Sequence, residues 1–155
     1  MQINLKGKTI LLGITGSISA YKACDIARLF IKAGAEVHVV MTPAAERFVS
    51  ALTFEALTRN PVLTEKSESW SSALNHIETG KKCDAFVVAP ATANTINKLS
   101  KGIADNILTQ TALAFTGEIL IAPAANTAML NNHYTTGSIK MLRVNDYTII
   151  EPQEK

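Results

Sequence analysis

Short apolar runs alternate with helix-like segments along most of the chain. The runs lie at residues 9–14, 36–41, 85–89, 118–122 and 147–150. They are short, rich in β-branched and aliphatic residues, and apolar on both faces, which is typical of strands in a parallel sheet. In the segments between them apolar residues recur every three or four positions, as Ile96, Leu99 and Ile103 do. Five strands separated by helices predict one α/β domain with a doubly wound parallel sheet.

The ends of the expected helices carry recognisable signals. Gly34 is the expected stop of the helix after the first strand. Thr42 and Pro43 place an N-cap residue before a proline at the first helical position. Residues 64–72 are polar and patternless, so they predict a surface loop that holds Trp70, and residues 123–132 read as a polar turn. The helices expected in the second half lie at about 75–82, up to Lys101, 105–114 and 136–142.

Composition excludes several classes of protein. The 155 residues are 47% hydrophobic and 18% charged, which excludes disorder and fits a single domain. The net charge of +2 comes with scattered lysines, so we expect no nucleic-acid surface. No apolar stretch reaches the ~18 residues of a membrane span, and we expect no membrane partner. Cys24 and Cys83 show no metal or redox spacing, which favours a reduced, cytoplasmic compartment.

Hydrogen-bonding residues follow four of the predicted strands. They are Gly16 and Ser17, Thr42, Thr92 and Asn94, and Asn126. Each lies near a predicted helix start, where free N–H groups and the helix dipole favour an anion. The carboxyl ends of parallel strands meet at one edge of a sheet. The sequence therefore predicts a nucleotide or phosphate site at this edge.

The common nucleotide fingerprints do not fit. Residues 13–17 read GITGS rather than GxGxxG, and Met41-Thr42 stands where a ribose-binding acid would end the second strand. A P-loop sequence is also missing. A mononucleotide phosphate held by hydroxyls and backbone N–H groups fits better than a dinucleotide or an ATP P-loop.

The three histidines differ in their sequence surroundings. His38 alternates with valines inside a predicted strand, and His133 lies in the polar turn. His76 stands just before a predicted helix, outside any apolar stripe, and a histidine suits general-base chemistry near neutral pH. No Ser-His-Asp order and no metal-binding motif occurs, so we expect no metal.

Together, these segments resemble the homo-oligomeric flavin-containing cysteine decarboxylases. The motifs that carry the resemblance are GITGSISAYK (13–22), MTPAAERF (41–48), NHI (75–77), APATANTINKLSKGIADN (89–106) and APAANTAM (122–129). They follow the family's order over nearly the whole chain and are most similar to the amino-terminal flavoprotein domain of bacterial phosphopantothenoylcysteine decarboxylases. The resemblance implies a three-layer, Rossmann-like or flavodoxin-like fold over residues 1–155.

The resemblance also implies a cofactor, a substrate and their residues. FMN would be bound non-covalently by Gly16, Ser17, Ile18, Thr42, Pro90, Thr92, Asn94, Thr95, Asp105 and Asn106. His76 would be the active-site base. Asn126 would bind the substrate carboxylate, with Ala125 and Met129 shaping that pocket. The substrate would be 4′-phosphopantothenoyl-L-cysteine, and the active site would lie at the subunit interface of a homotrimer or dodecamer.

Two departures from the family pattern keep alternatives open. Ala125 stands where the family usually has methionine, and we expect this change to be tolerated. The family's flap cysteine and the ligase domain of its bifunctional members do not follow the last strand, so we expect a truncated domain or an enzyme of the oxidative half-reaction. The alternatives are a peptidyl-cysteine decarboxylase of lantibiotic synthesis and a flavin-binding subunit without turnover. A flavin prenyltransferase fits the motifs less well.

Overall fold

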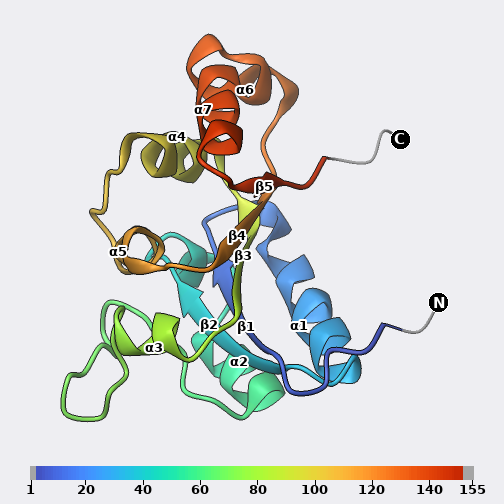
Figure 1. Ribbon diagram of the computed structural model, residues 1–155, viewed down its shortest axis with the longest axis vertical. Coiled ribbons are helices and arrows are strands. Elements are labelled where there is room, and N and C mark those ends of the chain that lie inside the picture. Colours follow the sequence, from blue (N-terminus) through green and yellow to red (C-terminus); the bar gives the residue numbers. More distant parts are fainter. Residues whose placement is uncertain (1–2, 152–155) are drawn as a thin grey trace.

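The computed structural model describes residues 3–151, and in it one five-stranded sheet lies between two layers of helices (Figure 1). The strands are β1 (Thr9–Ile14), β2 (Glu36–Met41), β3 (Ala85–Ala91), β4 (Glu118–Pro123) and β5 (Thr148–Ile149). All pairs are parallel, in the order β2-β1-β3-β4-β5. This order confirms the doubly wound sheet. It reverses between β1 and β3, where such sheets form a crevice at the carboxyl ends of their strands.

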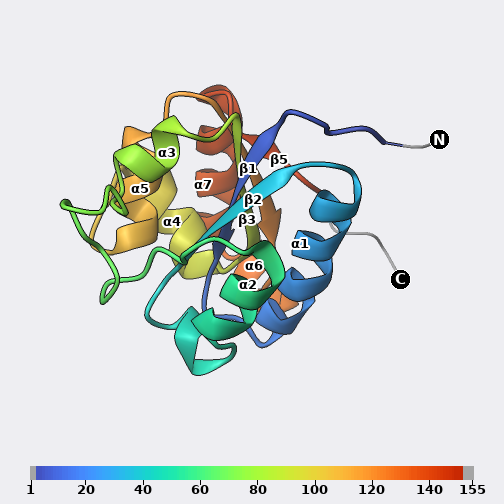
Figure 2. The same ribbon diagram turned by 90° about the horizontal axis from the view of Figure 1, so that it is seen from below.

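The helices follow the strands in alternation. They are η1 (Ile18–Tyr21), α1 (Lys22–Lys32), η2 (Ala45–Arg47), α2 (Ala51–Thr58), α3 (Glu78–Lys81), α4 (Ala93–Lys101), α5 (Ile107–Ala114), α6 (Thr127–Asn131) and α7 (His133–Val144). Helices α1 and α2 cover one face of the sheet, and α4, α5 and α7 cover the other (Figure 2). Gly34 follows α1 with φ of 101°, as a helix stop requires.

Strands β1 to β4 each contribute to two hydrophobic cores. In β1, Ile10 and Leu12 face the core under α1 and α2, whereas Leu11 faces the core under α4 and α5. Gly13 lies on that second face, where an added Cβ would come within 2.7 Å of the Phe86 ring. Because successive side chains of a strand point to opposite faces, a strand buried on both sides must be apolar throughout. This requirement explains the continuous apolar runs in the sequence.

The structure differs from the sequence prediction mainly in its short elements. Helix α6 lies inside the segment 123–132 that reads as a polar turn. Helix α3 is limited to four residues of the expected 75–82, and β5 to two of the expected 147–150. The surface loop at 64–72 is confirmed, with Trp70 64% exposed. Within residues 3–151, no helix combines the length and apolar character that crossing a membrane requires.

Candidate active site

A cleft of about 440 Å³ opens at the carboxyl edge of the sheet, beside the ends of β1, β2 and β3. Its lining includes Gly16, Thr42, Thr92, Asn94, Thr95, Asp105 and Asn106, together with Pro43, Ala44, Lys98 and Met129. The first seven are residues that the sequence analysis expected to bind the cofactor. The fold therefore brings residues from distant segments together in one cleft, which we call the edge cleft.

The floor of the edge cleft is formed by two loops in close contact. An added Cβ on Gly16 would lie 2.5 Å from the Cβ of Ala44, so the turn after β1 fits against the turn after β2 only without a side chain. Thr42 supports the second turn, because its Oγ1 accepts a hydrogen bond from the N–H of Ala45 at 3.1 Å. Gly16 and Ala44 together present little side-chain bulk to the cleft, which lets a ligand approach the backbone closely.

Thr15 joins the β1 turn to the β3 turn. This threonine is buried, and its hydroxyl donates to the carbonyl of Pro90 at 2.6 Å and accepts from the N–H of Thr92 at 3.0 Å. The N–H of Thr15 also donates to the Pro90 carbonyl, at 3.3 Å. The relative position of the two turns is thus fixed by hydrogen bonds between residues far apart in the sequence.

Two helices begin at the edge cleft with well-formed caps. Thr92 caps α4 by accepting from the N–H of Thr95 at 3.2 Å. Asn106 caps α5 in a reciprocal capping box with Thr109. The backbone N–H groups in the first turn of a helix have no partner within the helix, and those that the capping side chain does not bind can donate to a ligand. The start of α4 therefore suits the phosphate or carbonyl oxygens of a ligand, whereas the first N–H of α5, that of Ile107, already donates to the Glu65 carboxylate at 2.6 Å.

Lys98 and Asp105 form an ion pair at the rim of the edge cleft. The Nζ of Lys98 donates to Oδ1 of Asp105 at 2.9 Å. Such a partly exposed pair contributes only about 0–1 kcal/mol to stability. Its main effect is positional, because it connects α4 to the segment before α5 across the cleft. Lys98 was not among the residues expected from the sequence, although it lies one helical turn after Asn94.

A second, wider depression adjoins the edge cleft and shares three of its residues. This groove has a volume of about 820 Å³ and lies between α4, α6 and α7. The shared residues are Asn94, Lys98 and Met129, and the groove adds Asn126, Lys101, Ile103 and Tyr134, among others. We call it the helix groove. A molecule bound in the edge cleft would thus have a neighbouring site for a second molecule.

Asn126 presents a free amide donor to the helix groove. Its Oδ1 accepts from the N–H of Met129 at 2.9 Å and caps α6. The carbonyl end of the amide is therefore engaged, and the NH2 end remains to donate to a ligand. A neutral donor held in this way can orient a carboxylate without neutralising it.

The back wall of the helix groove is a polar contact between α4 and α7. Asn97 donates to the Thr135 hydroxyl at 3.2 Å and accepts from the Ser138 hydroxyl at 2.7 Å. Ser100 also donates to Ser138, at 2.7 Å. This network positions α7, and with it Asn132 and Tyr134, relative to the start of α4.

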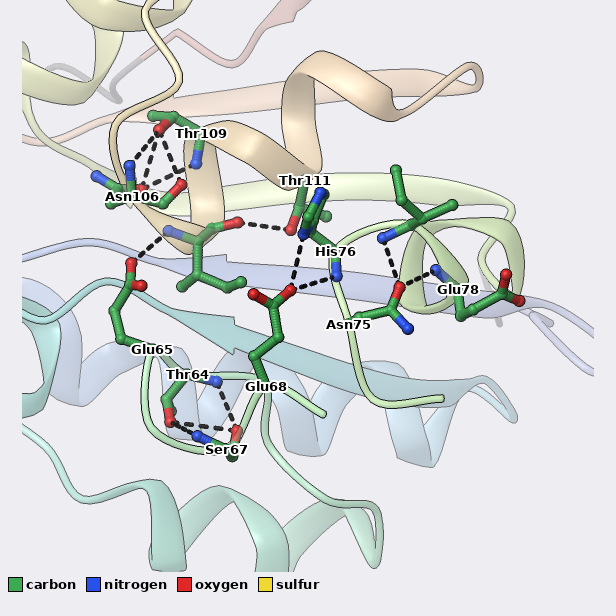
Figure 3. Close-up of polar contacts among 12 residues, drawn as sticks. Thr64, Glu65, Ser67, Glu68, Asn75, His76, Glu78, Asn106, Thr109 and Thr111 are labelled. Atoms are coloured by element: carbon green, nitrogen blue, oxygen red, sulfur yellow. Dashed lines mark hydrogen bonds and ion pairs between the residues drawn. The ribbon is translucent and has the colours of Figure 1, made fainter. Parts of the chain in front are cut away.

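His76 does not line either depression. It lies before α3, which stands at the amino end of β3 and packs against α5, while α6 with its cap Asn126 follows the carboxyl end of β4 (Figure 1). The imidazole Nδ1 of His76 is 2.7 Å from Glu68 Oε2, and the backbone N–H of His76 donates to the same oxygen at 3.1 Å (Figure 3). The Trp70 ring meets the imidazole edge-on at 5.5 Å between centroids.

Four other expected site residues lie outside the lining of the two depressions. Ser17 caps η1 through the N–H of Ser19, and Ile18 beside it is exposed. Pro90 is buried and provides the carbonyl that Thr15 contacts. Ala125 directly precedes Asn126 in the turn after β4. Ser17 and Ile18 directly follow Gly16, which lines the edge cleft.

Both cysteines are poor candidates for chemistry. Burial, reinforced by the Asp84 carboxylate, raises the pKa of the Cys83 thiol to about 12. Burial also raises the pKa of Cys24, with Asp25 adding to the effect. The reactive form of cysteine is the thiolate, which both environments disfavour.

Among residues 3–151 no group of three or more His, Cys, Asp or Glu side chains could hold a metal ion.

Comparisons with known proteins agree with this architecture. Residues 2–155 match the Flavoprotein family. The coenzyme A biosynthesis bifunctional protein CoaBC of Bacillus subtilis is 44% identical over 151 residues, which cover 97% of this chain and 37% of that protein. The probable phosphopantothenoylcysteine decarboxylase of Streptococcus mutans is 43% identical over 149 residues, 94% of this chain and 83% of the relative.

A solved structure shows the same fold. The FMN-dependent cysteine decarboxylase TvaF from thioviridamide biosynthesis superimposes with a TM-score of 0.87 at 34% identity, over 94% of this chain and 91% of that one. The chain spans only about 37% of the bifunctional relative's length. The Flavoprotein family model matches residues 2–155, nearly the whole chain, and the solved structure shares its fold at 34% identity. The chain therefore belongs to the Flavoprotein family.

Proposed function

We propose that the chain binds FMN and decarboxylates 4′-phosphopantothenoyl-L-cysteine in coenzyme A biosynthesis, in the cytoplasm. One observation carries the proposal: residues from the ends of β1, β2 and β3 and from the start of α5 line a single cleft, next to a groove that holds Asn126. The names of the Bacillus subtilis and Streptococcus mutans relatives support the reaction, and TvaF supports the cofactor.

The edge cleft fits FMN in size and chemistry. Its volume of about 440 Å³ lies within the ~300–1,000 Å³ of most small-molecule sites. The turn at Gly16 lies directly against Ala44 with no bulky side chain between them, and the start of α4 offers N–H groups to phosphate or ring carbonyl oxygens. Asn94 adds an amide that can both donate and accept, and Asn106, whose oxygen is bonded by Thr109, adds an NH2 donor.

The remaining residues account for substrate binding and proton transfer. Asn126 would hold the substrate carboxylate in the helix groove through its free NH2 group. The thiol proton of the substrate would pass to His76 while a hydride leaves the adjacent carbon, which gives a C=S bond. When bound, FMN supplies the acceptor for that hydride. The C=S bond then takes up the electron pair that remains when the C–C bond breaks and CO2 departs.

We further propose that the active site is completed by a second copy of the chain, in a homotrimer or dodecamer. His76 and the helix groove lie on different parts of one copy, so a single copy does not bring them together. Large apolar side chains are exposed at both places: Trp70 beside His76, and Met129 (48% exposed) and Tyr134 (80% exposed) at the groove. Contact between these two surfaces would bury them and bring His76 to the substrate.

A peptidyl-cysteine decarboxylase is the second candidate, supported by the likeness to TvaF. The lining of the helix groove favours the first candidate. It contains no acidic residue, and beside Lys98, which pairs with Asp105, it contains Lys101, whose charge suits a substrate that carries a phosphate. A flavin-binding subunit without turnover would share the edge cleft but would not need Asn126 or His76.

An absorption spectrum and a substrate comparison test the proposal. The purified chain should show bands near ~370 and ~450 nm that are released as FMN on denaturation. It should then liberate CO2 from 4′-phosphopantothenoyl-L-cysteine faster than from a peptide that ends in cysteine. His76→Asn should keep the bound flavin and lose CO2 release. A chain that cannot be loaded with FMN would refute the proposal, and equal inactivity of wild type and variant would favour the subunit without turnover.

A further inference from the structure

The carboxylate of Glu68 makes an unusually complete contact with His76. One oxygen, Oε2, accepts from the backbone N–H of His76 at 3.1 Å and lies 2.7 Å from its imidazole Nδ1 (Figure 3). The side chains of both residues are 24% exposed, so water competes with the contact only in part. A carboxylate held to both the backbone and the ring of one residue fixes the direction in which that ring points.

The contact also selects one tautomer of the imidazole. An ionised carboxylate oxygen can only accept hydrogen bonds, so the ring nitrogen that faces it must carry a proton. A neutral histidine has one N–H and one unprotonated nitrogen. With the proton on Nδ1, the nitrogen left to take up a proton is Nε2. The Trp70 ring packs edge-on against the imidazole, with 5.5 Å between the ring centroids, and this favourable aromatic contact accompanies the hydrogen bond.

Glu68 is itself held in place by the loop that carries it. Its N–H donates to the carbonyl of Thr64 at 3.1 Å, and the next residue, Ser69, donates to the carbonyl of Leu74 at 2.7 Å. Ser67 and Thr64 exchange further bonds within the same turn (Figure 3). The loop is joined to α5 where Glu65 accepts from the N–H of Ile107 at 2.6 Å. The carboxylate is therefore in position before any substrate arrives.

We propose that Glu68 is the positioning residue for His76: it keeps the proton on Nδ1 and presents Nε2 as the nitrogen that takes the substrate thiol proton. The inference rests on the proposed function, because it assumes that His76 is the base. It adds to that function the residue that determines which ring nitrogen acts. The same logic places the carboxylate of a catalytic triad behind its histidine.

The test measures the tautomer directly and the reaction separately. The FMN-loaded protein is prepared with ¹⁵N-labelled histidine, and the signals of His76 are identified among the three histidines by their loss in His76→Asn. In the wild type we expect the neutral ring to carry its proton on Nδ1. In Glu68→Ala we expect the proton to move to Nε2 in much of the population, and kcat to fall by about 10²-fold, in line with the usual contribution of a general base.

Two further variants separate charge and loop effects. Glu68→Gln keeps an oxygen acceptor without the charge, so its loss of kcat should be smaller than that of Glu68→Ala. Ser71→Ala removes the exposed contact between the Ser69 and Ser71 hydroxyls in the same loop and should change neither tautomer nor kcat. KM should stay nearly constant in all three variants, because Glu68 does not line the helix groove.

The outcomes distinguish this inference from the proposed function. A wild type that releases CO2 but carries the proton on Nε2 overturns the role of Glu68 and leaves the proposed function intact. The same holds if Glu68→Ala alters neither the tautomer nor kcat, or if Ser71→Ala lowers kcat equally. A wild type without any CO2 release refutes the proposed function, whatever the tautomer of His76.

Discussion

At the scale of single residues, the proposed function gives Asn126 two tasks with one amide. Its oxygen caps α6 through the N–H of Met129, and its NH2 group would bind the substrate. These tasks can be separated by substitution, because aspartate and serine cap a helix about as well as asparagine does, but neither has the NH2 donor. The structural and the functional contribution of this residue can therefore be measured independently.

Asn126→Asp should leave the fold intact and impair the reaction. We expect the free energy of unfolding to change by less than about 0.5 kcal/mol. kcat/KM should fall by about 10²-fold or more, since a hydrogen bond to a charged group is lost and two carboxylates then face each other. The kcat/KM of Asn126→Ser should fall less, because serine carries no charge that repels the substrate carboxylate. A kcat/KM of Asn126→Asp equal to that of the wild type would mean that Asn126 does not hold the substrate carboxylate.

At the scale of elements, the turns after β1 and β3 act as one unit through Thr15. The hydroxyl of this buried residue satisfies the Pro90 carbonyl and the Thr92 N–H together. Thr92 in turn caps α4, so the position of this helix start depends on a side chain from β1's turn. The geometry of the edge cleft thus depends on a contact between two elements that are not consecutive in the chain.

Thr15→Val tests this connection with little change in shape. Valine leaves two buried polar groups without this partner, so the free energy of unfolding should fall by about 1–3 kcal/mol in urea denaturation. FMN affinity should fall as well, because the two turns lose their fixed spacing. Thr15→Ser keeps the hydroxyl and should bind FMN more tightly than Thr15→Val. If Thr15→Val bound FMN as tightly as Thr15→Ser, the hydroxyl of Thr15 would not be needed for the FMN site.

The elements also show what could be predicted from the sequence. The strands β1 to β4 and the capped starts of α4 and α5 follow from local patterns, since burial on both faces and capping both leave marks within a few residues. Helix α6 has no buried residue, so it shows no apolar periodicity and reads as a turn. The roles of Thr15, Lys98 and Glu68 depend on partners that only the folded chain brings near, and no local pattern indicates them.

At the scale of the whole molecule, the residues that the proposed reaction needs are divided between two surfaces. The edge cleft and the helix groove form one surface, and His76 with Glu68 and Trp70 belongs to the other. In a cyclic oligomer each copy would offer its groove to one neighbour and its His76 to the next, so every interface would contain one complete site. Two defective chains could then complement each other.

Mixing two inactive variants tests this arrangement. His76→Asn keeps the groove, and Asn126→Asp keeps His76, so an interface with His76 from one variant and Asn126 from the other is complete. With random exchange of subunits about a quarter of the interfaces would have this composition. We therefore expect about a quarter of wild-type CO2 release after the two variants are unfolded together and refolded with FMN. Each variant refolded alone is the control and should stay inactive. If the mixture also stays inactive while wild type treated in the same way recovers, His76 and Asn126 act within one chain, and His76 must reach the groove by a movement of its loop.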